Sequence, residues 1–180
     1  MELASKLGMR ARLSINFLPN AVYEPRACIQ ATLQAAAEFD FDPRQIMFEI
    51  TEGEQIVDLA HVKRILRTYR ELGFCTAIDD FGAGYAGLGL LADYQPDVVK
   101  LDMAIVRHVD REKPRRVICR AAADMAAELG VRLVAEGVET VGEFETLQAL
   151  GVELFQGYLF AKPGFENLPE VKGFLEPTTS

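Results

Sequence analysis

Several residue types that would mark particular classes of protein are scarce in this sequence. Its three cysteines, Cys28, Cys75 and Cys119, are widely spaced and form no Cys-x-x-Cys pair, so the sequence predicts neither a disulfide framework nor a zinc site. We expect them to be small core residues in a reducing compartment. The two histidines, His61 and His108, lack metal-ligand spacing, so we expect surface or packing roles for both.

Long hydrophobic runs are also missing. No run approaches the length of a membrane span, and the N-terminus carries Glu2 and no long apolar segment, so the sequence indicates neither direct membrane insertion nor a secretory signal. A net charge of -8 disfavours nonspecific binding to DNA and to anionic membranes. We therefore expect a cytoplasmic protein, and any phosphate ligand would need a local attraction such as a bound metal ion.

The most informative segment that is present runs from Phe74 to Gly87. An apolar, strand-like run ends there in two adjacent carboxylates, Asp79 and Asp80, and then enters a glycine-rich turn. Each buried carboxylate costs several kcal/mol unless it is paired or bound to a metal, and neighbouring carboxylates repel each other. The pair therefore predicts a divalent cation.

The glycines of this turn allow two other interpretations. Gly82, Gly84 and Gly87, with Asp102 about twenty residues further on, fit the dinucleotide-binding fingerprint G-x-G-x-x-G. A pyrophosphate at this turn would face two carboxylates, which disfavours a nicotinamide cofactor. An Asp-Phe-Gly triplet is typical of protein kinases, but the His-Arg-Asp loop and the Val-Ala-Ile-Lys strand are absent.

A repeated pattern predicts the fold class. Four times, a helix-like run ends in Leu-Gly before an apolar run, and the glycines at these junctions are Gly8, Gly73, Gly130 and Gly151. A glycine just past a helix end takes the left-handed conformation that leads the chain into the next strand. We predict strands over 9–17, 45–50, 74–78, 97–101, 131–135 and 152–155, and helices near 26–38, 55–71, 84–93, 114–129 and 140–149. Such alternation favours an α/β fold with a parallel sheet covered by helices.

Each predicted strand ends in a polar side chain capable of chemistry. These residues are Asn16, Glu49, Asp79 with Asp80, Lys100, Glu136 and Gln156. Taken singly, each could be a turn former, a helix cap or a solvated charge. Together they fit the carboxyl end of a TIM-barrel-like fold, where such barrels place their active sites.

The number of predicted strands is six rather than eight. Residues 1–8 are typical of the last turns of a helix, so the sequence begins inside a repeat. We therefore expect residues 1–180 to form a single, N-terminally truncated domain with an incomplete barrel. Its two open edges would be completed by further sequence or by another chain.

Six motifs follow one another at the predicted strand ends. They are Ser14-Ile15-Asn16, Phe48-Glu49-Ile50-Thr51-Glu52, Ile78-Asp79-Asp80-Phe81-Gly82-Ala83-Gly84-Tyr85, Val99-Lys100-Leu101-Asp102, Ala135-Glu136-Gly137-Val138-Glu139-Thr140 and Gln156-Gly157-Tyr158-Leu159-Phe160. In order and spacing, from Leu13 to Pro163, they resemble the EAL family of cyclic di-GMP phosphodiesterases. This is a bacterial signalling family with a TIM-barrel-like fold.

The resemblance implies a metal site and a reaction. Asn16, Glu49 and Asp79 look like ligands of Mg²⁺ or Mn²⁺, Asp80 like a ligand of a second ion, and Glu136 like another carboxylate of the metal site. Carboxylate and amide oxygens suit such hard cations independently of the resemblance. The implied reaction is hydrolysis of one phosphodiester bond of cyclic di-GMP to give linear pGpG.

Other residues acquire roles by the same resemblance. Lys100 is similar to the lysine that orients the attacking water, and Gln156 to a residue that helps to place it. Glu52 resembles the glutamate that anchors the loop from Asp79 to Tyr85. Gly82 and Gly84, with Gln156, are expected to contact the substrate.

Departures from the family pattern qualify these expectations. The Glu-Ala-Leu motif and the arginine that follows it closely are absent, which removes a metal ligand and a phosphate contact. We therefore expect weak hydrolysis or none from this chain alone. The alternative is a catalytically degenerate domain that binds cyclic di-GMP or a protein. The expected protein partner is a second copy of the chain or an upstream sensory or regulatory domain.

Overall fold

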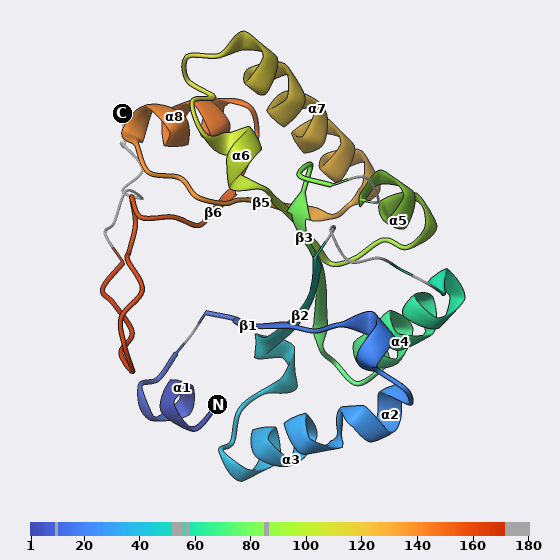
Figure 1. Ribbon diagram of the computed structural model, residues 1–180. Helices are drawn as coiled ribbons and strands as arrows, with labels where there is room; N and C mark the ends of the chain where they lie inside the picture. Colours follow the sequence, from blue (N-terminus) through green and yellow to red (C-terminus); the bar gives the residue numbers. More distant parts are fainter. Residues whose placement is uncertain (10, 52–55, 57, 85–86, 172–180) are drawn as a thin grey trace.

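The structure, a computed structural model, describes residues 1–9, 11–51, 56, 58–84 and 87–171. Within these ranges six strands form one parallel sheet in chain order. They are β1 (Leu13–Asn16), β2 (Ile46–Thr51), β3 (Cys75–Phe81), β4 (Val98–Leu101), β5 (Arg132–Ala135) and β6 (Leu154–Phe155). The sheet curves into an arc, and β1 and β6 lie at its two open ends (Figure 1).

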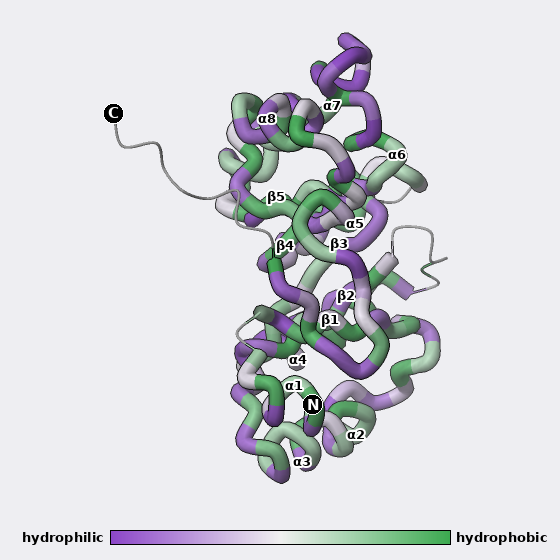
Figure 2. The backbone as a smooth tube through the Cα atoms, turned by 90° about the vertical axis from the view of Figure 1, so that its left-hand side faces the viewer, coloured by the Kyte–Doolittle hydropathy of each residue, from purple (hydrophilic) through white to green (hydrophobic). Residues whose placement is uncertain are grey.

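The helices lie around the outside of this arc (Figure 1). They are α1 (Glu2–Lys6), α2 (Pro25–Cys28), α3 (Gln30–Glu38), α4 (Leu59–Glu71), α5 (Gly87–Asp93), α6 (Met103–Val106), α7 (Lys113–Leu129) and α8 (Val141–Ala149), with 3-10 turns at Pro19–Ala21 and Pro43–Gln45. Hydrophobic and hydrophilic residues both occur along the helices (Figure 2), and the longer helices α4 and α7 each bury one face, as expected for amphipathic helices. None of the described helices has the length and hydrophobicity needed to cross a bilayer.

The predicted fold class is confirmed: the described residues form an α/β, TIM-barrel-like fold whose six strands do not close into a barrel. The four junction glycines, Gly8, Gly73, Gly130 and Gly151, all have positive φ, between 63° and 91°. Each of them closes a helix before the next strand, as the Leu-Gly pattern predicted. Local backbone preference therefore determines where these four helices end and the chain turns into the next strand.

Some element boundaries differ from the prediction. The helix expected over 26–38 is divided at Ile29 into α2 and α3, and β1 is shorter than the predicted strand over 9–17. Helix α6 was not predicted because it has only four residues. Asp102 caps its start, and its side chain accepts a hydrogen bond from the Ala104 amide at 2.8 Å. The expectation that Cys28 is a core residue was wrong, because it ends α2 on the exposed side, whereas Cys75 and Cys119 are buried.

Each strand places alternate side chains in different layers. Outward-facing residues pack under the helices in two clusters: one contains Phe48 beneath α3 and α4, and the other contains Val99 and Leu133 beneath α5, α7 and α8. The inward face carries a small hydrophobic layer of Met47, Cys75, Ala77 and Val98, with Val134 packed against it. This layer fills the concave side of the sheet below the polar residues of the site.

Candidate active site

The polar site lies next to the inner hydrophobic layer, toward the carboxyl ends of the strands. Successive residues of a strand point to opposite faces, so residues two apart share a face. The site residues lie two positions after interior residues: Glu49 after Met47, Asp79 after Ala77, Lys100 after Val98 and Glu136 after Val134. Strand alternation thus brings four charged side chains from four strands to the same end of the sheet.

Lys100 lies at the centre of this layer. Its Nζ donates to Glu49 Oε2 at 2.9 Å and to Asp79 Oδ1 at 2.9 Å, and it forms an ion pair with Glu136 Oε1 at 2.8 Å. The ammonium has three N–H donors, and each has a carboxylate acceptor. Lys100 is 5% exposed, so these are buried ion pairs.

Burial and the neighbouring carboxylates act in opposite directions on Lys100. Burial alone lowers the pKa of its ammonium, but the hydrogen bonds and charges of Glu136, Asp79 and Glu49 outweigh this effect, and the net pKa is raised. Burial raises the pKa of the Glu136 carboxyl; Lys100 opposes this, whereas the charges of Asp79 and Glu49 add to it. Lys100 therefore stays charged in a cluster that holds more carboxylates than ammonium groups.

A bulge brings Asp79 and Asp80 to the site together. Ile78 pairs with Val99 and Phe81 pairs with Leu101, so β3 has one more residue than β4 between these pairs. Asp80 takes a φ of 55°, and its amide donates to Asp79 Oδ1 at 3.1 Å. Bulges re-aim side chains in this way. The predicted strand end at Ile78 was wrong, because the strand continues through the bulge.

The donor groups at this position fit a divalent metal ion. Asp79, Asp80 and Glu136 each offer one carboxylate oxygen, and these oxygens all lie within 4.8 Å of one another. Glu49 Oε1 is buried without a hydrogen-bond partner among the described residues. Burial, followed by the charges of Asp79 and Asp102, raises the pKa of the Asp80 carboxyl. A cation bound by Asp79, Asp80 and Glu136 would relieve their mutual repulsion, and Glu49 Oε1 offers a further oxygen donor in the same layer. Oxygen donors suit Mg²⁺ or Mn²⁺.

A pocket of about 290 Å³, lined in part by charged residues, opens beside these carboxylates. Three predicted site residues line it, namely Asp80, Glu136 and Gln156. Arg107 also lines the pocket and donates to both carboxylate oxygens of Glu139, at 3.0 and 2.6 Å. The pocket therefore combines an acidic side with a fixed, bidentate ion pair.

The other predicted site residues do not line this pocket. Asn16 shares its register position with Glu49 at the end of β1, and its side chain is exposed. Gly82 and Gly84 line a separate, largely apolar pocket of about 390 Å³ that lies between the loop after β3 and helix α7. Glu52, like Tyr85, lies outside the described residues.

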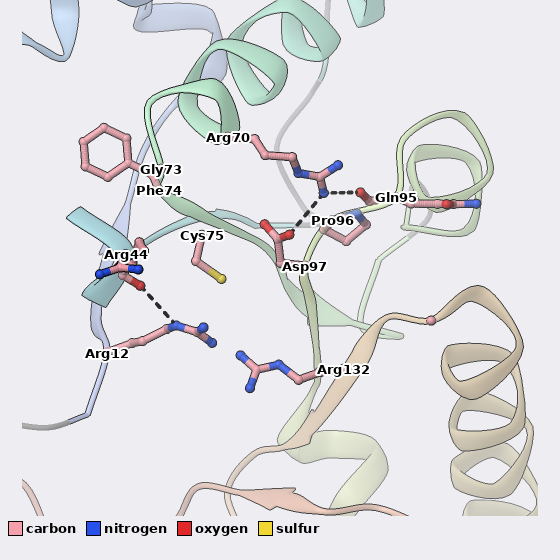
Figure 3. Close-up of a pocket in the computed structure, with 11 residues that line it drawn as sticks. Arg12, Arg44, Arg70, Gly73, Phe74, Cys75, Gln95, Pro96, Asp97 and Arg132 are labelled. Carbon is pink, nitrogen blue, oxygen red and sulfur yellow. Dashed lines mark hydrogen bonds and ion pairs between the residues drawn. The ribbon is translucent and has the colours of Figure 1, made fainter. Parts of the chain in front are cut away.

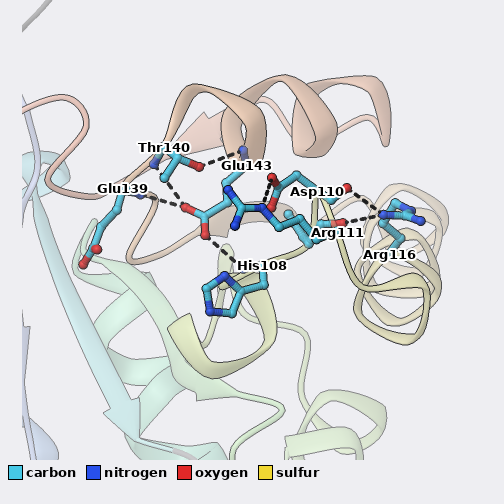
Figure 4. A network of polar contacts seen from close by, with 8 residues as sticks. His108, Asp110, Arg111, Arg116, Glu139, Thr140 and Glu143 are labelled. Carbon is cyan, nitrogen blue, oxygen red and sulfur yellow. Dashed lines mark hydrogen bonds and ion pairs between the residues drawn. The ribbon is translucent and has the colours of Figure 1, made fainter.

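The sequence interpretation missed a buried network that supports the pocket wall. Glu143 is 3% exposed and accepts hydrogen bonds from the His108 amide at 2.9 Å, the Glu139 amide at 3.0 Å and the Thr140 amide at 3.1 Å (Figure 4). Burial by itself raises the pKa of Glu143, but these backbone hydrogen bonds outweigh it and leave the net pKa below its ordinary value. The spacing Thr140-x-x-Glu143 is a capping box, and this signal could have identified it.

The network joins the two walls of the pocket. His108 follows Arg107 after α6, whereas Glu139 and Thr140 belong to the loop that carries Glu136 after β5. A single buried carboxylate thus fixes the position of one wall relative to the other. Deleting it would leave three backbone N–H groups without this acceptor.

Tight packing at two glycines completes the pocket. A Cβ atom on Gly157 would collide with the backbone of Val138, and one on Gly137 would meet Met103 Cβ at 2.5 Å. Gly137 also has a φ of 66°. The loops after β5 and β6 can lie this close to each other and to α6 because neither position carries a side chain.

Comparisons with known proteins identify the family of this chain. A family model described as "EAL domain" matches residues 2–163. The blue light- and temperature-regulated antirepressor BluF of Escherichia coli is 33% identical over 171 residues, which are 95% of this chain and 41% of BluF. The cyclic di-GMP phosphodiesterase PA2567 of Pseudomonas aeruginosa is 36% identical over 159 residues, which are 88% of this chain and 26% of that protein.

Solved structures share the fold. A standalone EAL protein of Vibrio cholerae O395, in a c-di-GMP-bound form, is 52% identical with a TM-score of 0.89, and the match covers 94% of this chain and 72% of that one. BlrP1 of Klebsiella pneumoniae, in a manganese and cyclic di-GMP complex, is 37% identical with a TM-score of 0.86, covering 94% and 44% of the two chains. The chain spans less than half the length of the two curated relatives named above. From its motifs, its fold and a family match over most of its length, the chain belongs to the EAL domain family.

Proposed function

We propose that this chain forms the metal-binding and catalytic face of a cyclic di-GMP phosphodiesterase, which opens cyclic di-GMP to linear pGpG. The observation that carries the proposal is the layer of Glu49, Asp79 and Glu136 around Lys100, with Asp80 beside it. A group of converging, buried charges costs folding free energy and therefore has a use beyond packing. Membership of the EAL family suggests that these charges serve the hydrolysis of cyclic di-GMP.

In this proposal the carboxylates hold the metal and Lys100 supports them. Asp79, Asp80, Glu136 and Glu49 would hold Mg²⁺ or Mn²⁺, with Asn16 at the adjacent strand end; two ions are the expected number. When bound, the metal would activate water and neutralise phosphate charge. A manganese complex of BlrP1 supports a divalent ion here.

The chain's own groups position the reactants. Lys100 keeps its positive charge because three carboxylates hold it, and this charge would stabilise the phosphate oxygens. To orient a water molecule as well, Lys100 would have to release one of its three N–H donors from a carboxylate, for example when that carboxylate binds the metal. Gln156, in the same pocket as Asp80 and Glu136, would help to place that water. The water oxygen forms a new bond to phosphorus, the bond to one ribose O3′ breaks, and the proton from water ends on that leaving oxygen.

The test is hydrolysis of cyclic di-GMP by the full-length protein that contains this chain. With Mn²⁺ we expect release of pGpG, and Asp79→Asn should lower kcat at least about 100-fold, since each 1.36 kcal/mol of lost stabilisation costs tenfold. Asp124→Asn, at an exposed position on α7, is the matched control and should stay within about twofold. Equal turnover of the two variants would refute the role of Asp79.

A second function is supported by one relative. BluF, which is 33% identical, is named as an antirepressor, so relatives of this chain include a protein named for regulation rather than hydrolysis. A catalytically degenerate domain would bind cyclic di-GMP or a protein without cleaving it, and a BlrP1 structure does hold cyclic di-GMP with no metal ions. Binding without release of pGpG at saturating Mn²⁺ would favour this alternative.

The proposal also includes partners, domain extent and location. The sheet of the described residues leaves one side of β1 and of β6 unpaired, so we expect residues 1–180 to be one truncated EAL-type domain whose barrel is completed by further strands. The apolar pocket at Gly82 and Gly84 is bordered by Leu88, Val117 and Ile118, which are exposed by 66%, 59% and 48% and suit a second copy of the chain. An upstream sensory domain in the longer protein and a cytoplasmic location complete the proposal.

A further inference from the structure

The end of the sheet opposite the catalytic layer has a second pocket of about 630 Å³. Its lining comes from residues at or just before the beginnings of strands: Arg12 precedes β1, Arg44 precedes β2, and Arg132 begins β5. Arg70, near the end of α4, and Asp97, just before β4, complete its charged lining. Four arginines and one aspartate thus surround one cavity in a chain whose net charge is -8.

Two of these arginines already have carboxylate partners. Arg70 Nη2 lies 3.4 Å from Asp97 Oδ1 and donates to the Gln95 carbonyl at 2.7 Å. Asp97 is itself held by Thr76, whose amide and hydroxyl both donate to Asp97 Oδ2 at 2.8 Å. Arg44 pairs with Asp42 at 2.7 Å, outside the pocket lining.

Arg12 and Arg132 differ from these two. Arg12 Nε donates to the Arg44 carbonyl at 3.4 Å, and neither Arg12 nor Arg132 forms an ion pair within the described part of the chain. Figure 3 shows their side chains extending toward each other across the pocket. The nearby Cys75 thiol adds no negative charge, because burial raises its pKa. Two guanidinium groups that face each other without a carboxylate repel.

We propose that this pocket binds a phosphate group between Arg12 and Arg132. The arginine forks offer paired N–H donors that match phosphate oxygens, and an anion between them replaces their repulsion with attraction. The bound group is inorganic phosphate or the terminal phosphate of a nucleotide, which share this chemistry. The site lies at the strand beginnings, away from the catalytic carboxylates at the strand ends, so it does not depend on the proposed hydrolysis.

The experiment is a calorimetric titration of the chain with inorganic phosphate and, separately, with GMP. Both titrations use metal-free buffer that contains EDTA. EDTA removes metal-dependent binding at the carboxylate end. A BlrP1 structure holds cyclic di-GMP without metal ions, so only binding that is lost in the arginine variant reports on the arginine end. Guanosine serves as the ligand control because it lacks the phosphate. The test variant is Arg12→Gln with Arg132→Gln, and the matched control is Arg67→Gln with Arg120→Gln, at exposed arginines without an ion pair among the residues described.

We expect a Kd below about 1 mM for inorganic phosphate or GMP, no binding of guanosine, and a Kd raised at least about tenfold by the test variant. The control variant should stay within about twofold of the unmodified chain. Binding of GMP but not of inorganic phosphate would identify a nucleotide phosphate as the source, and the reverse would identify free phosphate. Failure of both ligands to bind, or equal loss in the two double variants, would overturn the proposal.

Discussion

The two ends of the sheet carry opposite charges, and they differ in burial: the acidic end is buried and the basic end is exposed. At the strand ends, Lys100 is buried and contacts three carboxylates, Glu49, Asp79 and Glu136. At the strand beginnings the arginines are exposed, and Arg12 and Arg132 form no ion pair among the described residues. The same parallel strands therefore separate an acidic, desolvated site from a basic, solvated one.

This difference indicates which kind of ligand each end can accept. The acidic end has an excess of carboxylate oxygens and one buried, unsatisfied Glu49 oxygen, so it favours a cation. The basic end favours an anion. Charges at the acidic end are also expected to matter far more to stability, because buried ion pairs leave a desolvated charge when one partner is removed.

The largest expected effect is at Lys100. Lys100→Met leaves three carboxylates without their shared ammonium, and breaking a buried pair in this way costs about 3–5 kcal/mol of unfolding free energy. Added Mn²⁺ should restore part of this loss, because a metal supplies the missing positive charge. Chemical denaturation with and without Mn²⁺ measures both effects.

Lys63 provides the matched control for Lys100. It pairs with Asp93 at 3.0 Å in a partly exposed ion pair on the helical surface. Lys63→Met should cost no more than about 1 kcal/mol and should not respond to Mn²⁺. Similar losses in the two variants would mean that the buried cluster has no special stability role.

A somewhat smaller effect is expected at Glu143, which supports the wall of the acidic pocket. Glu143→Ala removes the acceptor of three backbone N–H groups and should cost about 2–4 kcal/mol. Glu145→Ala, at an exposed position on the same helix, should change stability by no more than about 0.5 kcal/mol. Denaturant unfolding at neutral pH compares the two.

The contribution of Glu143 should also depend on pH. Its folded pKa lies below its ordinary value, so its stabilisation is fully present above the unfolded pKa of about 4.3 and is lost as the pH falls through the folded pKa. The difference in unfolding free energy between the unmodified chain and Glu143→Ala should therefore shrink in acid. A constant difference down to pH 3 would show that the carboxylate charge is not what holds the network.

The smallest effect is expected at the basic end. Arg12→Gln with Arg132→Gln should change the unfolding free energy by no more than about 0.5 kcal/mol in buffer without phosphate, since both side chains are exposed and lack an ion pair within the described ranges. Thermal unfolding checks this directly. A loss comparable to that of Lys100→Met would remove the contrast between the two ends.

Much of this arrangement could be predicted from sequence because it depends on local rules. The Leu-Gly junctions preceded four of the six strands that the structure describes, and the polar residues at the predicted strand ends grouped Glu49, Asp79 and Glu136 in one site. Asp79 and Asp80 were expected to need a cation, but the structure shows that the Lys100 ammonium already supplies one to Asp79.

What could not be predicted depends on pairing between distant segments. The bulge at Asp80 exists only in the register of β3 against β4, and the contacts of Lys100 require the curvature of the whole sheet. The Glu143 network joins segments on either side of helix α7, so only its capping-box half was visible in the sequence. The basic pocket was missed because its arginines are scattered along the chain and meet only when the strands align.

The central claim is that the carboxylates at the strand ends form a metal site. Calorimetric measurement of Mn²⁺ binding to this chain tests the claim without requiring turnover. We predict that the unmodified chain and Asp124→Asn bind Mn²⁺ with similar affinity, and that Asp79→Asn raises the Kd at least about tenfold. Equal Mn²⁺ affinity in Asp79→Asn and Asp124→Asn, or no binding to the unmodified chain, would contradict the account.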